Sequence, residues 1–147
     1  MKTIIYIDFN NTIEDIYLKR RGYKYFNAIS RLANLCQDNL EIYVITKANV
    51  SLEEDMSNFL FMCPDYQRTF YKGIIKNGGK TKLDGVELSR KIIDKDNSAS
   101  LYLFIGDDKD DDLPMIKASV KCKKYMILAN NRRFVPHIEN VIKTTKH

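Results

Sequence analysis

Short apolar runs alternate along the chain with longer segments whose apolar residues recur every three or four positions. Runs with the length and the β-branched or aromatic content of buried strands cover residues 3–7, 40–45, 101–105 and 124–128. A short strand is expected over residues 68–75. Helical spacing predicts helices near residues 25–38, 51–63, 83–93 and 135–142. Strands that alternate with helices predict an α/β fold with a mainly parallel sheet and right-handed crossovers.

Local signals predict where several elements begin and end. Ser51 followed by Glu54 is a capping-box pattern that predicts the start of the second helix, and Pro64 predicts its end. Asn77-Gly78-Gly79 predicts a turn, and a short helix is expected to begin around Leu113-Pro114. Because no repeat, linker or low-complexity tract interrupts the pattern, we expect residues 1–147 to form a single domain.

Carboxylates gather directly after two of the predicted strands. Asp8 follows the first strand and opens the segment Asp8-Phe9-Asn10-Asn11-Thr12, and five aspartates lie between residues 107 and 112, after the strand at 101–105. If these two strands are parallel neighbours, their carboxyl ends meet at the edge where open α/β sheets place their chemistry. Two acidic clusters at one edge predict a metal site.

Composition narrows the setting of this site. The net charge of +5 favours a phosphorylated or polyanionic partner, although dispersed basic residues also serve solubility. No apolar stretch approaches the roughly 20 residues of a membrane span, and the first residues run into a strand rather than a signal peptide, so we expect a cytoplasmic protein without a membrane partner. Cys36, Cys63 and Cys122 share no metal-binding spacing and are predicted to be reduced structural thiols.

Four short motifs follow the predicted elements in a fixed order. The first strand ends in Asp8-x-Asn10-x-Thr12, the second ends in Thr46, a lysine precedes the apolar pattern of a later helix, and Gly106-Asp107 follows the strand at 101–105. In this order the motifs resemble those of the haloacid dehalogenase (HAD) superfamily, and the resemblance covers nearly the whole chain. It implies a Rossmann-like three-layer sandwich and a Mg²⁺-dependent phosphatase that forms an aspartyl-phosphate.

The resemblance also implies a role for each matched residue. Asp8 would be the nucleophile, and an aspartate suits this role because it is ionised at neutral pH. Thr46 would donate its hydroxyl to a phosphoryl oxygen, and Lys82 would supply positive charge. Lys80 competes with Lys82, which we favour because the apolar helical pattern begins directly after it. The residues expected to bind substrate are Asn11, Thr12, Thr46, Lys47 and Lys82.

Magnesium binding is implied for the same edge. The expected ligands are the Asp8 carboxylate, the main-chain carbonyl of Asn10 and the Asp107 carboxylate, with Asp108 or Asp111 acting through water. Asp112 is the alternative to Asp111. An oxygen-only ligand set suits a hard ion, and without a cation the clustered carboxylates would repel one another.

Asn10 departs from the family motif, which has a second aspartate at this position. In the family this aspartate is the general acid and base, and an amide has no titrating proton with which to do either. Losing acid–base assistance costs about 10²–10⁴-fold in rate, so we expect impaired turnover with phosphate and metal binding retained. A natural degenerate enzyme, a branch with its acid elsewhere and an engineered substitution are all compatible with the sequence.

The short spacing between motifs bears on the substrate. Only about 33 residues separate Thr12 from Thr46, and about 35 separate Thr46 from Lys82, which leaves no room for a sizeable cap domain. An open site accepts a bulky substrate such as a nucleic-acid end, or a small one such as a sugar phosphate or nucleotide that a second subunit of a homo-oligomer encloses. The alternatives are a non-catalytic protein that binds a phosphorylated ligand and a nucleic-acid-binding protein that uses its basic surface. Five tyrosines would permit nucleotide stacking, although tyrosines at helical spacing are more typical of packing: Tyr17, Tyr23, Tyr25, Tyr66 and Tyr71.

Overall fold

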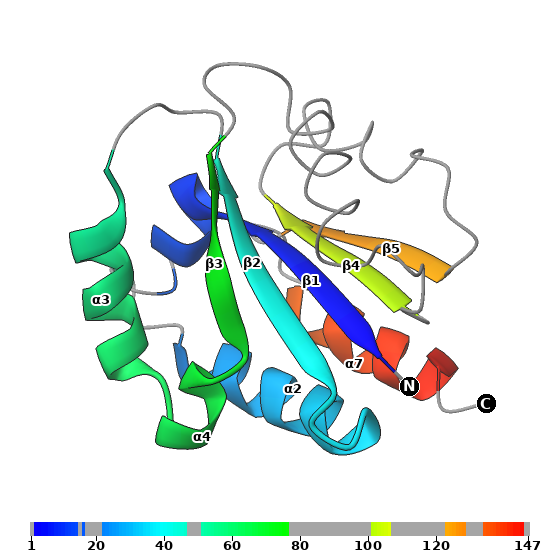
Figure 1. Cartoon of the computed structure of the whole chain (residues 1–147). Helices are drawn as coiled ribbons and strands as arrows, with labels where there is room; N and C mark the ends of the chain where they lie inside the picture. The colour runs from blue at the N-terminus through cyan, green and yellow to red at the C-terminus, as the bar shows by residue number, and fades with distance from the viewer. Residues whose placement is uncertain are drawn as a thin grey trace.

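Five parallel strands form the centre of the molecule, in the order β3-β2-β1-β4-β5 (Figure 1). The computed structural model describes residues 2–14, 16, 22–46, 51–76, 101–106, 123–128 and 134–145. Its strands are β1 (Thr3–Asp8), β2 (Leu40–Thr46), β3 (Tyr71–Lys76), β4 (Leu101–Gly106) and β5 (Lys123–Leu128). Each strand pairs in parallel with its neighbours, and β1 lies at the centre between β2 and β4.

The sheet confirms the predicted α/β fold with a parallel sheet, and the four longer predicted strands are present. The strand expected within residues 68–75 begins later, at Tyr71, because Asp65–Arg68 form a short helix, α4, that the sequence pattern did not predict. Gln67 of this helix is fully buried, and its Nε2 donates a hydrogen bond of 2.7 Å to the carbonyl of Phe26. This contact joins residues far apart in sequence, so a local pattern carries no sign of it.

Three of the predicted helices are present as α2 (Gly22–Leu35), α3 (Glu53–Met62) and α7 (Phe134–Thr145). Helices α2 and α7 lie side by side (Figure 1), and Arg31 of α2 pairs with Glu139 of α7 at 2.8 Å. The expected turn at 77–79, the helix at 83–93 and the helix near 113–114 lie outside the described residues. No described helix is long and apolar enough to span a membrane.

The capping box predicted at Ser51 and Glu54 is wrong. The N-cap of α3 is Leu52, and no side chain makes a capping hydrogen bond there. The Ser51 hydroxyl instead donates to the carboxylate of Glu53. The capping-box pattern would have this hydroxyl bond to the helix backbone, but its partner here is a side chain. The helix is stabilised by its buried residues Met56 and Phe59 rather than by a cap.

The core has two layers because side chains alternate along each strand. Six aliphatic side chains face α2, α3 and α7 from the three central strands: Ile5, Ile7, Ile42, Val44, Leu103 and Ile105. The other layer is aromatic, with Tyr6 at its centre, stacked on Tyr43 of β2 at 6.1 Å and on Tyr102 and Phe104 of β4 at 6.2 and 5.5 Å between ring centroids. Burial on both sides fixes β1 rigidly and therefore fixes the residue at its end.

Candidate functional site

The ends of β1, β2 and β4 meet at one edge of the sheet, as the sequence predicted for β1 and β4. Asp8, the last residue of β1, pairs in register with Ile45, so Thr46 lies one residue further along β2. On the other side Ile7 pairs with Ile105, so Gly106 ends β4 level with Asp8 and Asp107 follows directly in the chain. The first, second and fourth motifs therefore belong to adjacent strand ends.

Asp8 is held at the junction of a strand and a turn. Its backbone is extended, with φ −70° and ψ 147°, and the residue is 5% exposed. It is the N-cap of the π-helical turn η1 (Phe9–Ile13), in which the Glu14 amide donates to the Phe9 carbonyl. Wide turns of this kind are frequent at functional sites. The turn contains the backbone of Asn10 and Asn11, whose side chains are not among the parts of the chain that the structure describes.

Two threonines are buried at this edge. Thr12 lies in η1 and is fully buried, and its Oγ1 has no hydrogen-bond partner in the part of the chain that the structure describes. Thr46 is 2% exposed. Strand alternation assigns Asp8 to the aromatic layer and Thr46 to the aliphatic layer, so these two side chains share the edge rather than a face of the sheet. A ligand bound beyond the ends of both strands could contact Asp8 and Thr46 together.

The remaining predicted site residues lie outside the described residues: Lys47, Lys80, Lys82, Asp107, Asp108, Asp111 and Asp112. Within the described ranges no group of three or more histidine, cysteine, aspartate or glutamate side chains is gathered as a metal site. The described ligands expected for Mg²⁺ are the Asp8 carboxylate and the backbone of Asn10. Both offer oxygen, and a buried carboxylate at a strand end is a donor that fits a hard cation.

A lysine that the sequence interpretation missed also lies at this edge. Lys76 ends β3 and pairs in register with Thr46, and its Nζ is 2.8 Å from Oε1 of Glu53. Hydrogen bonds from Lys76 and then from Ser51 lower the pKa of Glu53 to about 2. The signal was available in Ile74-Ile75-Lys76, where a charged residue ends an apolar strand just as Asp8 ends β1.

Two of the tyrosines considered for nucleotide stacking, Tyr25 and Tyr71, are instead part of the core. Tyr25 is fully buried, and its hydroxyl lies 3.0 Å from that of the half-buried Tyr71. Tyr66 is 52% exposed. The packing interpretation of Tyr25 and Tyr71 therefore holds over the stacking one.

Comparisons with protein-family models, with curated proteins and with solved structures found no significant match to this chain. The ordered motifs and the geometry of the strand ends are therefore the observations that bear on function.

Proposed function

We propose that this chain is a HAD-like, Mg²⁺-dependent phosphatase that hydrolyses a phosphomonoester through an aspartyl-phosphate on Asp8, with turnover impaired by Asn10. The observation that carries the proposal is the buried carboxylate of Asp8 at the end of the central strand, between the ends of β2 and β4. A parallel sheet places its reactive residues at this edge, and the neighbouring strand ends supply Thr46 and the start of the acidic segment.

The proposed reaction has two displacements at phosphorus. An Asp8 carboxylate oxygen attacks the phosphoryl group in line, the bond from phosphorus to the ester oxygen breaks, and the alcohol leaves with a proton taken from an acid. Water then attacks the aspartyl-phosphate, loses a proton to a base, and releases inorganic phosphate and the free Asp8 carboxylate. Thr46 donates a hydrogen bond to a phosphoryl oxygen, and Lys82 adds positive charge.

Magnesium fits the residues proposed to hold it, which are Asp8, the Asn10 carbonyl, Asp107 and, through water, Asp108 or Asp111. When bound, the ion neutralises charge on the phosphoryl oxygens. The place of Asp8 at the end of the central strand supports this assignment, because a carboxylate oxygen is the kind of ligand that a hard cation prefers.

Asn10 determines how much of this reaction the chain performs. Its amide neither protonates the leaving alcohol nor takes a proton from water. The turn η1 nevertheless presents its backbone, and an asparagine carbonyl on the main chain serves a metal as well as that of an aspartate. Binding of metal and phosphate should therefore be retained while catalysis is slowed.

The test compares hydrolysis of an aryl phosphate with Mg²⁺ by the chain as it stands and by Asn10→Asp. Restoring the acid should raise kcat at least about tenfold, towards the roughly 10²–10⁴-fold that acid–base assistance supplies. Asn34→Asp, on the exposed side of α2, is the matched control, because it makes the same chemical change away from the strand ends, and it should leave kcat unchanged. Equal activity in all three proteins, or none in any of them, would refute the phosphatase.

A non-catalytic protein that binds a phosphorylated ligand is the second candidate, and Asn10 is the observation that favours it. Here inorganic phosphate should bind with Mg²⁺ by calorimetry, Asp8→Ala should abolish that binding, and Asn10→Asp should add no turnover. The short motif spacing, which predicts no sizeable cap, leaves sugar phosphates, nucleotides and nucleic-acid ends as candidate ligands for either function.

A further inference from the structure

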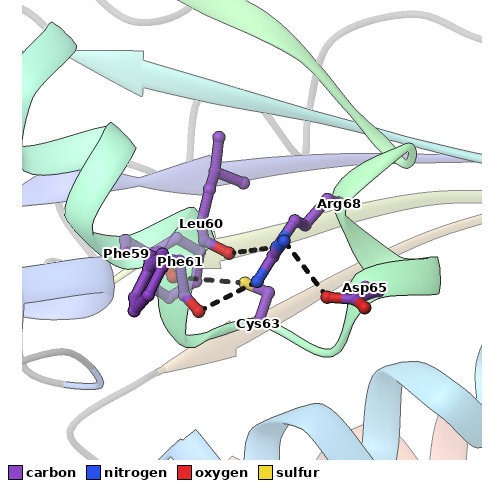
Figure 2. A network of polar contacts seen from close by, with 6 residues as sticks. All are labelled: Phe59, Leu60, Phe61, Cys63, Asp65 and Arg68. Atoms are coloured by element: carbon purple, nitrogen blue, oxygen red, sulfur yellow. Dashed lines mark hydrogen bonds and ion pairs between the residues drawn. The ribbon is translucent and has the colours of Figure 1, made fainter.

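Two basic residues hold helix α3 at its two ends, one before strand β3 and one at the end of that strand. Arg68 donates from Nε to the carbonyl of Leu60 at 2.8 Å and from Nη2 to that of Phe61 at 3.0 Å, in the last turn of α3 (Figure 2). Lys76 ends β3, and its Nζ is 2.8 Å from Oε1 of Glu53, the first residue of α3. The helix and the strand therefore lie side by side and run in opposite directions (Figure 1).

The two ends of α3 are stabilised differently. At the end of the helix, Arg68 satisfies carbonyls of the last turn and also pairs with Asp65 at 3.1 Å (Figure 2). At the start, no side chain makes a capping hydrogen bond, and the Ser51 hydroxyl donates to the Glu53 carboxylate instead. A first turn without a cap is prone to fray. The ion pair from Lys76 therefore fixes a turn that has no cap.

Thr46 depends on the same lysine through the sheet. The last pair between β1 and β2 joins Asp8 to Ile45. Thr46 lies one residue beyond this pair, and its partner in register is Lys76 of β3. β3 is the edge strand of the sheet on this side, and the end of an edge strand opens more readily than the middle of a central one. Here the Lys76 side chain holds that end to α3.

The direction of the side chains supports the same connection. Residues paired in register on adjacent strands place their side chains on the same face of the sheet. Thr46 and Lys76 therefore share the face that α3 covers, in agreement with the contact between Lys76 and Glu53. Arg68, by contrast, is separated from this edge by the length of β3, six residues or about 20 Å of extended chain.

We propose that Lys76 is a positioning residue for the candidate site: through Glu53 it holds the start of α3 against the end of β3, and so keeps Thr46 where its hydroxyl can donate to the phosphoryl group. This inference rests on the proposed function, in which Thr46 makes that hydrogen bond. Lys76 acts through its neighbours because its ammonium group is already paired with Glu53. A direct contact with the phosphoryl group would require Lys76 to leave this partner.

The test measures hydrolysis of an aryl phosphate with Mg²⁺ in the Asn10→Asp background. Lys76→Met and Glu53→Gln should each lower kcat/KM about twofold to fivefold, which is the scale of an ion pair as exposed as this one. Lys76→Arg keeps a cation for Glu53 and should retain most of the activity. If Lys76 instead contacted the phosphoryl group, Glu53→Gln would free its charge and raise kcat/KM, and that result would overturn the positioning role.

A double-mutant cycle with Thr46 tests the route of the effect. Thr46→Val removes the hydroxyl at nearly constant shape, so adding Lys76→Met to it should cause no further loss of kcat/KM. A further loss as large as in the Thr46 protein would overturn the inference, because Lys76 would then act by another route.

Arg68→Gln is the matched control, because it loosens the opposite end of the same helix. It should lower the thermal midpoint at least as much as Lys76→Met does, since it removes hydrogen bonds to two carbonyls, but it should leave kcat/KM unchanged. Circular dichroism shows that each variant is folded. Equal losses of kcat/KM from the two variants would mean that only the general stability of α3 matters, which would also overturn the inference.

Failure of this inference can be told apart from failure of the proposed function. If Asn10→Asp is active and Lys76→Met leaves its activity unchanged, the positioning role alone is wrong. If Asn10→Asp is inactive, the phosphatase is wrong, and the same variants are compared for Mg²⁺-dependent binding of inorganic phosphate by calorimetry. Lys76→Met and Glu53→Gln should then weaken that binding by similar factors. Equal binding by all variants, or no binding by any, would overturn the positioning role as well.

Discussion

Among the described residues, buried polar side chains gather beneath α3 and, separately, at the end of β1. Beneath α3, the hydroxyls of Tyr25 and Tyr71 are 3.0 Å apart, Tyr71 also hydrogen-bonds with Cys63, and the Cys63 thiol donates to the Phe59 carbonyl at 3.4 Å. At the end of β1, Asp8 and Thr12 are buried, and Thr12 Oγ1 has no partner within the described residues.

The difference indicates what each group is for. Buried polar groups that satisfy one another add stability and specify a single packing arrangement. A buried hydroxyl left without a partner at a strand end costs stability, and such exceptions concentrate where a ligand or water completes the site. The first group is therefore structural, and the second is where we expect function.

The largest expected effect is on catalysis. In the Asn10→Asp background, Asp8→Asn should reduce phosphatase activity to that of the uncatalysed reaction, since the nucleophile is lost. The same change removes a buried charge, so the thermal midpoint without Mg²⁺ should stay the same or rise. Activity assays and thermal unfolding measure both, and retained activity would place the nucleophile elsewhere.

Alkaline pH should next distinguish the two groups. Burial raises the pKa of Cys63 from 9.0 to about 11, and it raises the pKa values of Tyr25 and Tyr71 above their ordinary value of 10.0. These pKa values are higher in the folded than in the unfolded state. The stability that these groups contribute is therefore fully present below pH 9 and is lost as the pH rises towards 11 and beyond. Urea unfolding from pH 8 to 11 should show the decline, and Tyr25→Phe/Tyr71→Phe should reduce it.

Breaking the network under α3 should have a smaller, measurable cost at neutral pH. Tyr25→Phe leaves the Tyr71 hydroxyl without this partner and should lower the free energy of unfolding by about 1–3 kcal/mol. Adding Tyr71→Phe removes the stranded hydroxyl as well, so the double variant should lose less than the sum of the two single losses. Additive losses in urea titrations would show that the two hydroxyls do not interact.

The smallest effect compares two buried threonines. Thr3 Oγ1 lies 3.0 Å from the Cys36 sulfur, so Thr3→Val should cost about 0.5–1.5 kcal/mol of unfolding free energy. Thr12→Val, of nearly the same shape, removes a hydroxyl without a described partner and should be neutral or slightly stabilising. A larger loss at Thr12 than at Thr3 would remove the distinction between buried hydroxyls with and without a described partner.

Patterns that extend over a whole strand or helix predicted the fold well. The apolar runs of β1, β2, β4 and β5 are long enough to be recognised alone, and their parallel arrangement follows from their alternation with helices. Helix α4 and the uncapped start of α3 could not be predicted in this way. Helix α4 depends on the Gln67 side chain donating to the main-chain carbonyl of Phe26, 41 positions away. The start of α3 depends on the Ser51 hydroxyl bonding to the Glu53 carboxylate in place of the helix backbone.

The candidate site was predictable in position but only partly in content. The place of Asp8 and Thr46 at strand ends follows from the apolar runs before them, and the pairing of β1 with β4 needed only the parallel topology. Lys76 was missed because the predicted strand ends at residue 75, and its approach to Glu53 depends on where α3 begins. The layer to which each end residue belongs depends on register, which no single strand reveals.

The pairing of Thr3 with Leu101 has a consequence for synthesis on the ribosome. β1 emerges before β2, which can pair with one of its flanks early, but the flank that β4 covers stays open until about a hundred further residues have been translated. During that interval an apolar strand presents open amide and carbonyl groups, the condition under which nascent chains associate wrongly. The growing polypeptide should therefore need a chaperone, or slow dilution in refolding, until β4 arrives.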